Sequence, residues 1–371
     1  MQRMNKTYMK RLGDYIRQVD VRNRDLAVDN LLGLSISKQF IPSIANTIGT
    51  DMANYKVVQP RQFGYVPITS RNGDKITVAL YDGDKPCIIS QAYIVFEVTD
   101  TDKLLPEYLM MWFRRPEFDR YARFKSHGSA REVFEWDEMC DVMLPVPSIE
   151  EQRKIVAEYY AVERRVENNR RLIATLESTA QTIYRQMFVD NIDPENLPQG
   201  WRMGEISELS ILKVGGDKPD VFSAYKTTKC NIPIYSNGIL DKGLYGYTNT
   251  SKIAQPCFTI SARGTIGACF LRMEPYFPIV RLISVIPKDE RTLMYQYKYF
   301  DNLNIEGDGS VQNQLTVPFL ELETMVIPKL DTMQRYNALV QPLYEHMVEI
   351  NKEQAILEKL CLLINSNLSN C

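Results

Sequence analysis

Glu138-Met-Cys-Asp-Val-Met-Leu-Pro145 recurs later in the chain as Glu321-Leu-Glu-Thr-Met-Val-Ile-Pro328. In each copy a helix-capping signal and a long heptad pattern follow, and a long strand-like stretch comes before. A repeat whose unit is a whole domain plus a long helix predicts two similar domains separated by a helical spacer. Such a molecule suits a target in two parts better than it suits a single catalytic cleft.

The bulk composition describes an ordinary globular protein. At 371 residues the chain exceeds the size of about 250–300 residues at which single cores stop growing. No run of 18 apolar residues occurs, and the first residues lack the apolar segment of a signal peptide. The seven cysteines form no C-x-x-C motif, which is typical of reduced thiols. We therefore expect a cytoplasmic protein without a membrane segment, a disulfide framework or a metal site.

Secondary-structure signals follow the same order in both halves. Residues 87–98 and 277–286 are rich in β-branched and aromatic side chains, so each is predicted as one buried strand. Residues 104–113 and 293–300 are each predicted as a short helix. The expected fold class is α+β, with two strand-rich domains at residues 1–147 and 191–330. Long helices are expected at 148–190 and 331–371, and the whole forms a pseudo-twofold internal repeat.

The two long helices are the clearest prediction. Ser148 with Glu151 fits a capping box, and Asp331 with Gln334 resembles one. A narrow apolar stripe between densely charged positions favours a coiled-coil pair over helices docked singly on their own domains. Pro342 is expected to kink the second helix. The helix-pair seam is predicted at Val162, Val166, Asn169, Ile173, Leu176, Leu343, Met347, Ile350, Gln354 and Leu357. Its two polar members, Asn169 and Gln354, are interpreted as devices that fix the register.

Catalytic motifs are missing from the sequence. Only two histidines occur, His127 and His346, so a histidine-dependent triad has almost no material. Neither G-x-x-x-x-G-K-[ST] nor G-x-G-x-x-G occurs, and no lysine follows an acidic residue by two positions as in many metal-dependent nucleases. The sequence does not predict an enzyme.

Five motifs carry a resemblance to a known family. Two strand-rich units, each followed by a capped long helix, resemble the specificity subunit of type I restriction–modification systems. The motifs, in the same order across essentially the whole chain, are Leu144-Pro-Val-Pro-Ser-Ile-Glu-Glu-Gln-Arg-Lys-Ile155, Leu197-Pro-Gln-Gly-Trp201, Ile232-Pro-Ile-Tyr-Ser-Asn-Gly238, Ile260-Ser-Ala-Arg-Gly-Thr-Ile-Gly267 and Ile327-Pro-Lys-Leu-Asp-Thr-Met-Gln-Arg335.

This resemblance implies a fold and a set of partners. The domains at 1–147 and 191–330 would be target recognition domains, each reading one half of a split sequence in double-stranded DNA. The two helices would pack antiparallel as a coiled coil and fix the gap between the halves. Two modification subunits would carry S-adenosylmethionine and methylate adenine, and a restriction/translocase subunit would use ATP and magnesium. The chain itself would bind no cofactor.

The charge pattern leaves a second reading open. The net charge of −2 counts against DNA binding, although basic residues gather within residues 1–24 and 114–131. A coiled-coil adaptor that binds only proteins is therefore the alternative hypothesis.

The resemblance does not name base contacts, so the candidates come from side-chain chemistry. Arg and Lys bind guanine edges and phosphates, whereas Asn and Gln read adenine. The polar loops at 126–131 and 307–314 occupy equivalent places in the two halves, but plain solvated turns are about as plausible. Arg263 could contact phosphate or brace a tight turn. The candidates are Arg71, Lys75, Ser129, Arg131, Lys226, Lys229, Arg263, Gln312 and Asn313.

Overall fold

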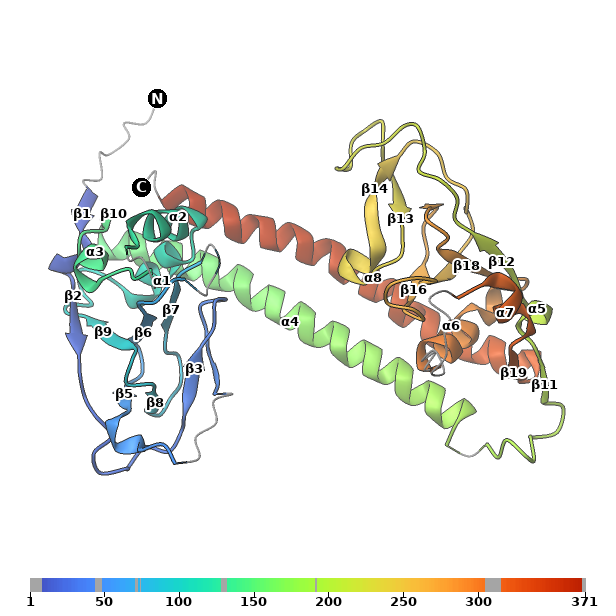
Figure 1. Ribbon diagram of the computed structural model, residues 1–371, viewed down its shortest axis with the longest axis horizontal. Coiled ribbons are helices and arrows are strands. Elements are labelled where there is room, and N and C mark those ends of the chain that lie inside the picture. The colour runs from blue at the N-terminus through green and yellow to red at the C-terminus, as the bar shows by residue number, and fades with distance from the viewer. Residues whose placement is uncertain are drawn as a thin grey trace. The chain divides into compact units, whose positions relative to one another are not determined.

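The structure is a computed structural model that describes residues 9–43, 49–70, 73, 75–127, 132–190, 192–303 and 315–368. The chain divides into two compact units: unit 1 is Met1–Asn169 with Lys352–Cys371, and unit 2 is Arg170–Asn351. Both units combine helices with strands (Figure 1), which confirms the predicted α+β class. None of the helices in the described ranges is long and apolar enough to cross a membrane.

Unit 1 is built on a four-stranded antiparallel sheet with the order β2-β9-β6-β7. Its strands are β1 (Met9–Arg11), β2 (Ile16–Val19), β3 (Leu32–Leu34), β4 (Phe40–Pro42), β5 (Lys56–Val58), β6 (Phe63–Val66), β7 (Thr77–Leu80), β8 (Cys87–Ile89), β9 (Ile94–Val98) and β10 (Met143–Pro145). Its short helices are η1 (Leu12–Asp14), η2 (Met52–Asn54), α1 (Pro106–Phe113), α2 (Pro116–Lys125) and α3 (Trp136–Cys140).

Unit 2 has the sheet order β12-β18-β15-β16, again antiparallel throughout. Its strands are β11 (Arg202–Glu205), β12 (Ser210–Val214), β13 (Ile232–Tyr235), β14 (Leu244–Thr248), β15 (Cys257–Ile260), β16 (Cys269–Arg272), β17 (Phe277–Pro278), β18 (Ile283–Pro287) and β19 (Thr324–Ile327). Its short helices are α5 (Ile206–Leu209), η3 (Leu240–Gly243), η4 (Glu290–Thr292), α6 (Leu293–Asn302) and α7 (Val317–Leu322).

The pairing of strands repeats between the units and confirms the internal duplication. β1 pairs antiparallel with β10 in unit 1, as β11 does with β19 in unit 2. The hairpin β3–β4 meets β8 through a parallel bridge between Leu31 and Ile88, and the hairpin β13–β14 meets β17 in parallel. The two hairpins therefore occupy equivalent places in the two units.

The prediction of one continuous strand at 87–98 and at 277–286 is wrong in both units. The first stretch is divided into β8 and β9 by a turn in which Tyr93 donates to the carbonyl of Ser90. The second is divided into β17 and β18 by Val280 and Arg281, whose φ angles are 52° and 61°. Two short buried strands in different sheets give the same apolar run as one long strand, so the composition could not separate them.

The core of unit 1 surrounds helix α1. Pro106 starts α1, and all its residues except Glu107 are buried, as expected of a helix that is apolar on every side. Phe63 and Phe96 stack with centroids 4.7 Å apart, and the ring of Phe113 meets both edge-on. Burying each of these rings stabilises the fold by roughly 1.5–3 kcal/mol. The predicted helix at 104–113 is confirmed, and α6 confirms its counterpart.

The two predicted long helices are present as α4 (Ile149–Phe188) and α8 (Leu330–Asn367). Ser148 Oγ accepts from the backbone N–H of Glu151 at 3.3 Å, as its predicted capping role requires. The predicted cap at Asp331 is wrong, because α8 starts one residue earlier and Asp331 pairs with Arg335 within its first turns.

Both helices take part in both units, and they run antiparallel in each. In unit 1, Arg165 and Asn169 of α4 hydrogen-bond Glu353 of α8. In unit 2, the hydroxyl of Tyr336 donates to the carbonyl of Ala180. The same helices also enter the core of each unit, through Tyr159 in unit 1 and Tyr184 in unit 2. The two long helices therefore pair with each other and also dock on the domains, whereas the sequence favours pairing alone.

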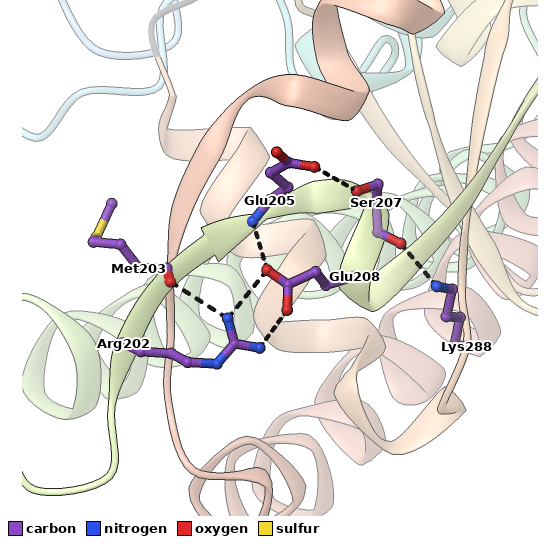
Figure 2. A network of polar contacts seen from close by, with 6 residues as sticks. All are labelled: Arg202, Met203, Glu205, Ser207, Glu208 and Lys288. Carbon is purple, nitrogen blue, oxygen red and sulfur yellow. Dashed lines mark hydrogen bonds and ion pairs between the residues drawn. The ribbon is translucent and has the colours of Figure 1, made fainter.

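A polar network holds the first strand of unit 2 to the helix that follows it. Figure 2 shows Arg202 against the carboxylate of Glu208, which also accepts from the backbone N–H of Glu205 at 3.0 Å. Lys288 donates to the carbonyl of Ser207 at 2.8 Å. Glu205 and Glu208 form a reciprocal capping box, so α5 is fixed although it has only four residues.

Candidate nucleic-acid interface

The loop between β15 and β16 carries Arg263 on a closed turn. Ser261 donates to the carbonyl of Ala268 at 3.0 Å, and Gly267 donates back to the carbonyl of Ser261 at 3.0 Å. Gly264 has a φ of 69°, a conformation that favours glycine. Arg263 is exposed at the tip of this loop. The predicted Ser-Ala-Arg-Gly motif is therefore a closed turn that carries an exposed arginine.

Asn237 joins this loop to two other segments. Its side-chain oxygen accepts from the backbone N–H of Ala262 at 2.8 Å, and its amide donates to the carbonyl of Val280 at 2.7 Å. Asn237 belongs to the turn of the β13–β14 hairpin, and Val280 to the turn between β17 and β18. One side chain thus fixes three loops of unit 2 against one another.

The turn at Val280 and Arg281 is strained. Both residues have left-handed φ angles, which cost about 1–2 kcal/mol each for residues other than glycine. The turn persists because Val280 donates to the carbonyl of Gly216 at 2.8 Å and Arg281 to that of Gly215 at 2.9 Å. Arg281 is exposed, as Arg263 is. Strain of this kind gathers at functional sites, so the turn is a candidate part of one.

A fourth segment reaches the same loop. Leu315 donates its backbone N–H to the carbonyl of Ala262, the neighbour of Arg263, at 2.9 Å. Leu315 follows residues 304–314, so the predicted candidates Gln312 and Asn313 lie outside the described residues. Their flanking residue is nevertheless fixed beside Arg263.

Unit 1 repeats this arrangement. Thr69, in the loop between β6 and β7, donates its backbone N–H to the carbonyl of Glu132 at 2.9 Å, and its hydroxyl contacts that of Ser126 at 3.1 Å. The candidates Arg71, Ser129 and Arg131 lie outside the described residues. In both units, therefore, the segments that flank the two candidate loops are hydrogen-bonded to each other.

Unit 1 also contains a basic cavity of about 940 Å³. Lys75, a predicted candidate, lines it. Two carboxylates lie in the wall, and five cationic side chains outnumber them. The lining residues that matter here are Ile36, Lys38, Lys75, Arg114, Asp119, Arg120, Arg123, Phe124 and Glu163. Arg120 also pairs with Glu117, and Arg123 with Glu132, so the exposed Lys75 supplies the positive charge that an anionic ligand would meet.

Two of the cations are fixed by buried or half-buried partners. Lys38 Nζ lies 2.6 Å from Asp119 Oδ1, and both side chains are buried. Burial lowers the pKa of Lys38, and the charge of Asp119 opposes that effect. Arg114 contacts Glu163 at 2.6 Å and the hydroxyl of Tyr159 at 3.1 Å. These two pairs shape the wall, and Lys75 remains exposed.

Lys226 and Lys229 lie elsewhere in unit 2, on an exposed turn between β12 and β13. Thr227 and Cys230 close that turn with two hydrogen bonds of 2.9 Å. Both lysines are exposed and stay predicted candidates for phosphate contacts.

The predicted seam residues lie inside the molecule. Val166, Asn169, Met347 and Ile350 are buried. The others are half-buried: Val162, Ile173, Leu176, Leu343, Gln354 and Leu357. Asn169 donates to Glu353 at 3.0 Å across the helix pair, whereas Gln354 donates to Glu358 of its own helix at 3.1 Å.

Sequence reasoning missed Lys38, Asn237 and Arg281. Asn237 belongs to the motif at residues 232–238, and its Asn-Gly pair is a turn signal. The local sequence does not indicate that Asn237 joins three loops. A left-handed arginine has no local signal at all, because only its tertiary hydrogen bonds impose that conformation.

Comparisons with known proteins agree with this geometry. The family model described as the type I restriction modification DNA specificity domain matches residues 198–360. A Mycoplasma pneumoniae protein whose name describes a type I specificity subunit is 32% identical over 152 residues, which make up 41% of this chain and 45% of that protein. The C-terminal part of another such M. pneumoniae subunit is 31% identical over 29% of this chain and 73% of its own length.

A solved structure shares the fold over the whole chain. The crystal structure of the type I restriction–modification S subunit from M. genitalium matches with a TM-score of 0.69 and 14% identity, covering 100% of this chain and 98% of that one. The chain belongs to the family of type I restriction–modification specificity subunits. The matched stretch spans less than half the length of the first curated relatives.

Proposed function

We propose that this chain is the DNA-recognition subunit of a type I restriction–modification complex in the cytoplasm. Each unit reads one half of a bipartite sequence in double-stranded DNA, and α4 with α8 sets the gap between the halves. Family membership and the duplicated strand order support this proposal. The observation that carries it is the shared loop junction, in which the same two candidate loops are tied together in both units.

The chemistry of the junction suits DNA. Arg263 and Arg281 are exposed guanidinium groups on rigid turns, and such groups bind phosphates or the guanine edge. In unit 1, the exposed Lys75 in the cavity wall supplies the corresponding positive charge. Rigid loops lose little conformational entropy on binding, so their contacts contribute more fully to affinity.

The remaining chemistry belongs to partners. Two modification subunits bind the chain and transfer a methyl group from S-adenosylmethionine to adenine. A restriction/translocase subunit adds ATP- and magnesium-dependent cleavage. The chain supplies neither reaction and binds no cofactor itself.

Co-expression of the chain with its modification subunits in a methylation-free host tests the proposal. Genome-wide mapping of N6-methyladenine should give one motif with two specified halves and an unspecified gap. The control is the modification subunits alone, which should leave no motif. An unmethylated genome, or a motif without a gap, would contradict the proposal.

The adaptor alternative predicts a different result in a binding assay. Phosphate contacts impose a steep dependence of affinity on salt concentration. The assembled complex should therefore lose duplex binding sharply between 50 and 200 mM salt. An adaptor that binds only proteins would show no such dependence.

A further inference from the structure

The equivalent hairpins β3–β4 and β13–β14 each present an exposed aliphatic side chain at the tip. Leu240 of unit 2 is 85% exposed, and Ile36 of unit 1 is 50% exposed. Each is followed by a lysine in the left-handed region, Lys242 with a φ of 55° and Lys38 with a φ of 62°. The same combination of an exposed aliphatic side chain and a left-handed lysine therefore occurs at equivalent places in both units.

The tip of the unit 2 hairpin is rigid. Gly243 has a φ of 80°, and a Cβ there would meet the carbonyl oxygen of Ser236 at 2.4 Å, so only glycine fits. Ser236 donates to the carbonyl of Gly243 at 2.8 Å, and Lys242 to that of Ile239 at 3.1 Å. Leu240 therefore projects from a turn whose backbone is fixed at both ends.

A buried arginine supports this turn from below. Arg272 Nη2 donates to the carbonyl of Lys242 at 2.6 Å, and its Nε donates to Thr259 at 3.0 Å. The guanidinium also lies 3.5 Å from the ring centroid of Tyr235. Burying a cation is costly unless it is hydrogen-bonded. The bonds of Arg272 to Lys242 and Thr259 therefore hold this turn in place.

The unit 1 tip is fixed by comparable bonds. Ser35 donates to the carbonyl of Gln39 at 3.0 Å, and Lys38 donates its backbone N–H to the carbonyl of Ser35 at 2.9 Å. The side chain of Lys38 is held by the buried Asp119. Ile36 thereby enters the wall of the basic cavity, beside Lys75, Arg120 and Arg123.

Exposed cations accompany both tips, Lys75 in the cavity wall with Ile36 and Lys242 on the turn of Leu240, and they point to the occupant. Ile36 lies among the cations of the cavity, and Asn237 links the hairpin of Leu240 to the loop of Arg263 and the turn of Arg281. An apolar side chain next to cations fits a polyanion with an apolar interior. Duplex DNA is such a polyanion, because its phosphates lie outside and its bases lie within.

Resting on the function proposed above, we propose that Leu240 and Ile36 are base-contacting residues. Each tip enters a groove and makes apolar contact with bases, such as a thymine methyl group or the face of an opened base step. The surrounding lysines and arginines hold the phosphates on either side. Asp241, the carboxylate of the unit 2 tip, is placed to accept from the amino group of cytosine.

The test measures the DNA affinity of the chain assembled with its modification subunits. Fluorescence anisotropy is recorded on a duplex that carries the mapped target and on a scrambled duplex. The variants are Leu240→Ser and Ile36→Ser. Leu322→Ser, at a residue 69% exposed on α7, is the apolar control, and Arg263→Ala is the phosphate-contact control. Each is measured at several salt concentrations.

We expect Leu240→Ser and Ile36→Ser to weaken target binding about tenfold with an unchanged salt slope, because no phosphate contact is lost. Binding to the scrambled duplex should not change. Arg263→Ala should instead lower the salt slope by about one and weaken both duplexes. Leu322→Ser should match the wild type.

Three results separate the possibilities. Unchanged target affinity in Leu240→Ser and Ile36→Ser overturns the inference and leaves the proposed function intact. Loss of subunit assembly in these variants, seen by size-exclusion chromatography, also overturns it, because the tips would then contact protein. A wild-type complex that binds target and scrambled duplexes equally contradicts the proposed function itself.

Discussion

The ion pair of Lys38 and Asp119 determines whether the wall of the unit 1 cavity can form. The two charged atoms are 2.6 Å apart, and Asp119 Oδ1 also accepts from the backbone N–H of Ile76 at 3.1 Å. Burial penalises the charged lysine and lowers its pKa, so the nearby carboxylate is needed to keep it charged. Removing the carboxylate would leave the backbone N–H of Ile76 without this acceptor and Lys38 without its counter-charge, although Lys38 Nζ would still donate to the carbonyl of Phe113.

Asp119→Ala should lower the free energy of unfolding by about 3–5 kcal/mol, the range for breaking a buried ion pair. Denaturant titration followed by circular dichroism measures this loss. Asp331→Ala removes an exposed partner of the exposed Arg335 and should cost at most about 1 kcal/mol. An equally small loss in Asp119→Ala would show that Lys38 does not depend on the pair.

The position of a single residue could be predicted only where its neighbours in the sequence form a recognisable motif. Arg263 stood in a glycine-rich motif, and the structure places it on an exposed turn. Phe113 and Phe118 are buried, but Phe124, near the end of α2, is 82% exposed. The spacing of aromatic residues gives the face of a helix, whereas the end of α2 lies beyond the core that covers that face.

Among the elements, the helix pair of unit 1 contains a buried asparagine that bonds across the pair. Asn169 is buried and donates to Glu353, which also accepts two hydrogen bonds from Arg165. A buried asparagine in a helix seam fixes the register and reduces stability. Its role is therefore specificity of pairing.

Asn169→Leu should raise the melting temperature by a few degrees, since Glu353 keeps Arg165 and a leucine fills the seam. Differential scanning calorimetry measures this change. Gln354→Leu is the matched control, because its amide bonds only within α8, and it should alter stability less. A fall of the melting temperature in Asn169→Leu would mean that the bond to Glu353 stabilises the pair on balance.

Helices α4, α6 and α8 meet in unit 2 through buried tyrosines. Tyr184, Tyr295 and Tyr336 belong to one core cluster, with ring centroids of the first 6.3 and 5.9 Å from those of the other two. Burial raises the pKa of all three above the usual value of about 10. They stay protonated in the folded chain at pH values where the unfolded chain ionises.

The free energy of unfolding should therefore fall as pH rises above about 10, by up to about 1.4 kcal/mol per pH unit for each buried tyrosine. Below that pH the tyrosines are protonated in both states and contribute no slope. Chemical denaturation between pH 9 and 11 measures the effect. Tyr184→Phe should reduce the slope by up to one proton, and an unchanged slope would contradict the assignment.

Elements were predictable where their pattern is long or has a distinctive end. The helices α4 and α8 have a long heptad pattern, and Pro106 in the first turn indicates the start of α1. The division of β17 from β18 depends on hydrogen bonds from Val280 and Arg281 to residues 215 and 216, far earlier in the chain. Contacts of that range leave no trace in local composition.

At the scale of the molecule, the duplication could be predicted because each domain ends in a short strand with a proline, just before its long helix. β10 ends at Pro145, and β19 is followed by Pro328. The equivalence of the hairpins was not visible, since Ser35–Gln39 and Ser236–Gly243 differ in length and share little sequence. Only the strand pairing around them reveals it.

The central claim is that each unit reads its own half of the target. The most direct measurement is the N6-methyladenine motif written by a chain in which residues 198–328 of unit 2 are replaced by residues 9–145 of unit 1. The account predicts a split motif in which the half read by unit 1 is unchanged and the other half becomes a copy of it. A motif altered in both halves, or one with no gap, would contradict the account.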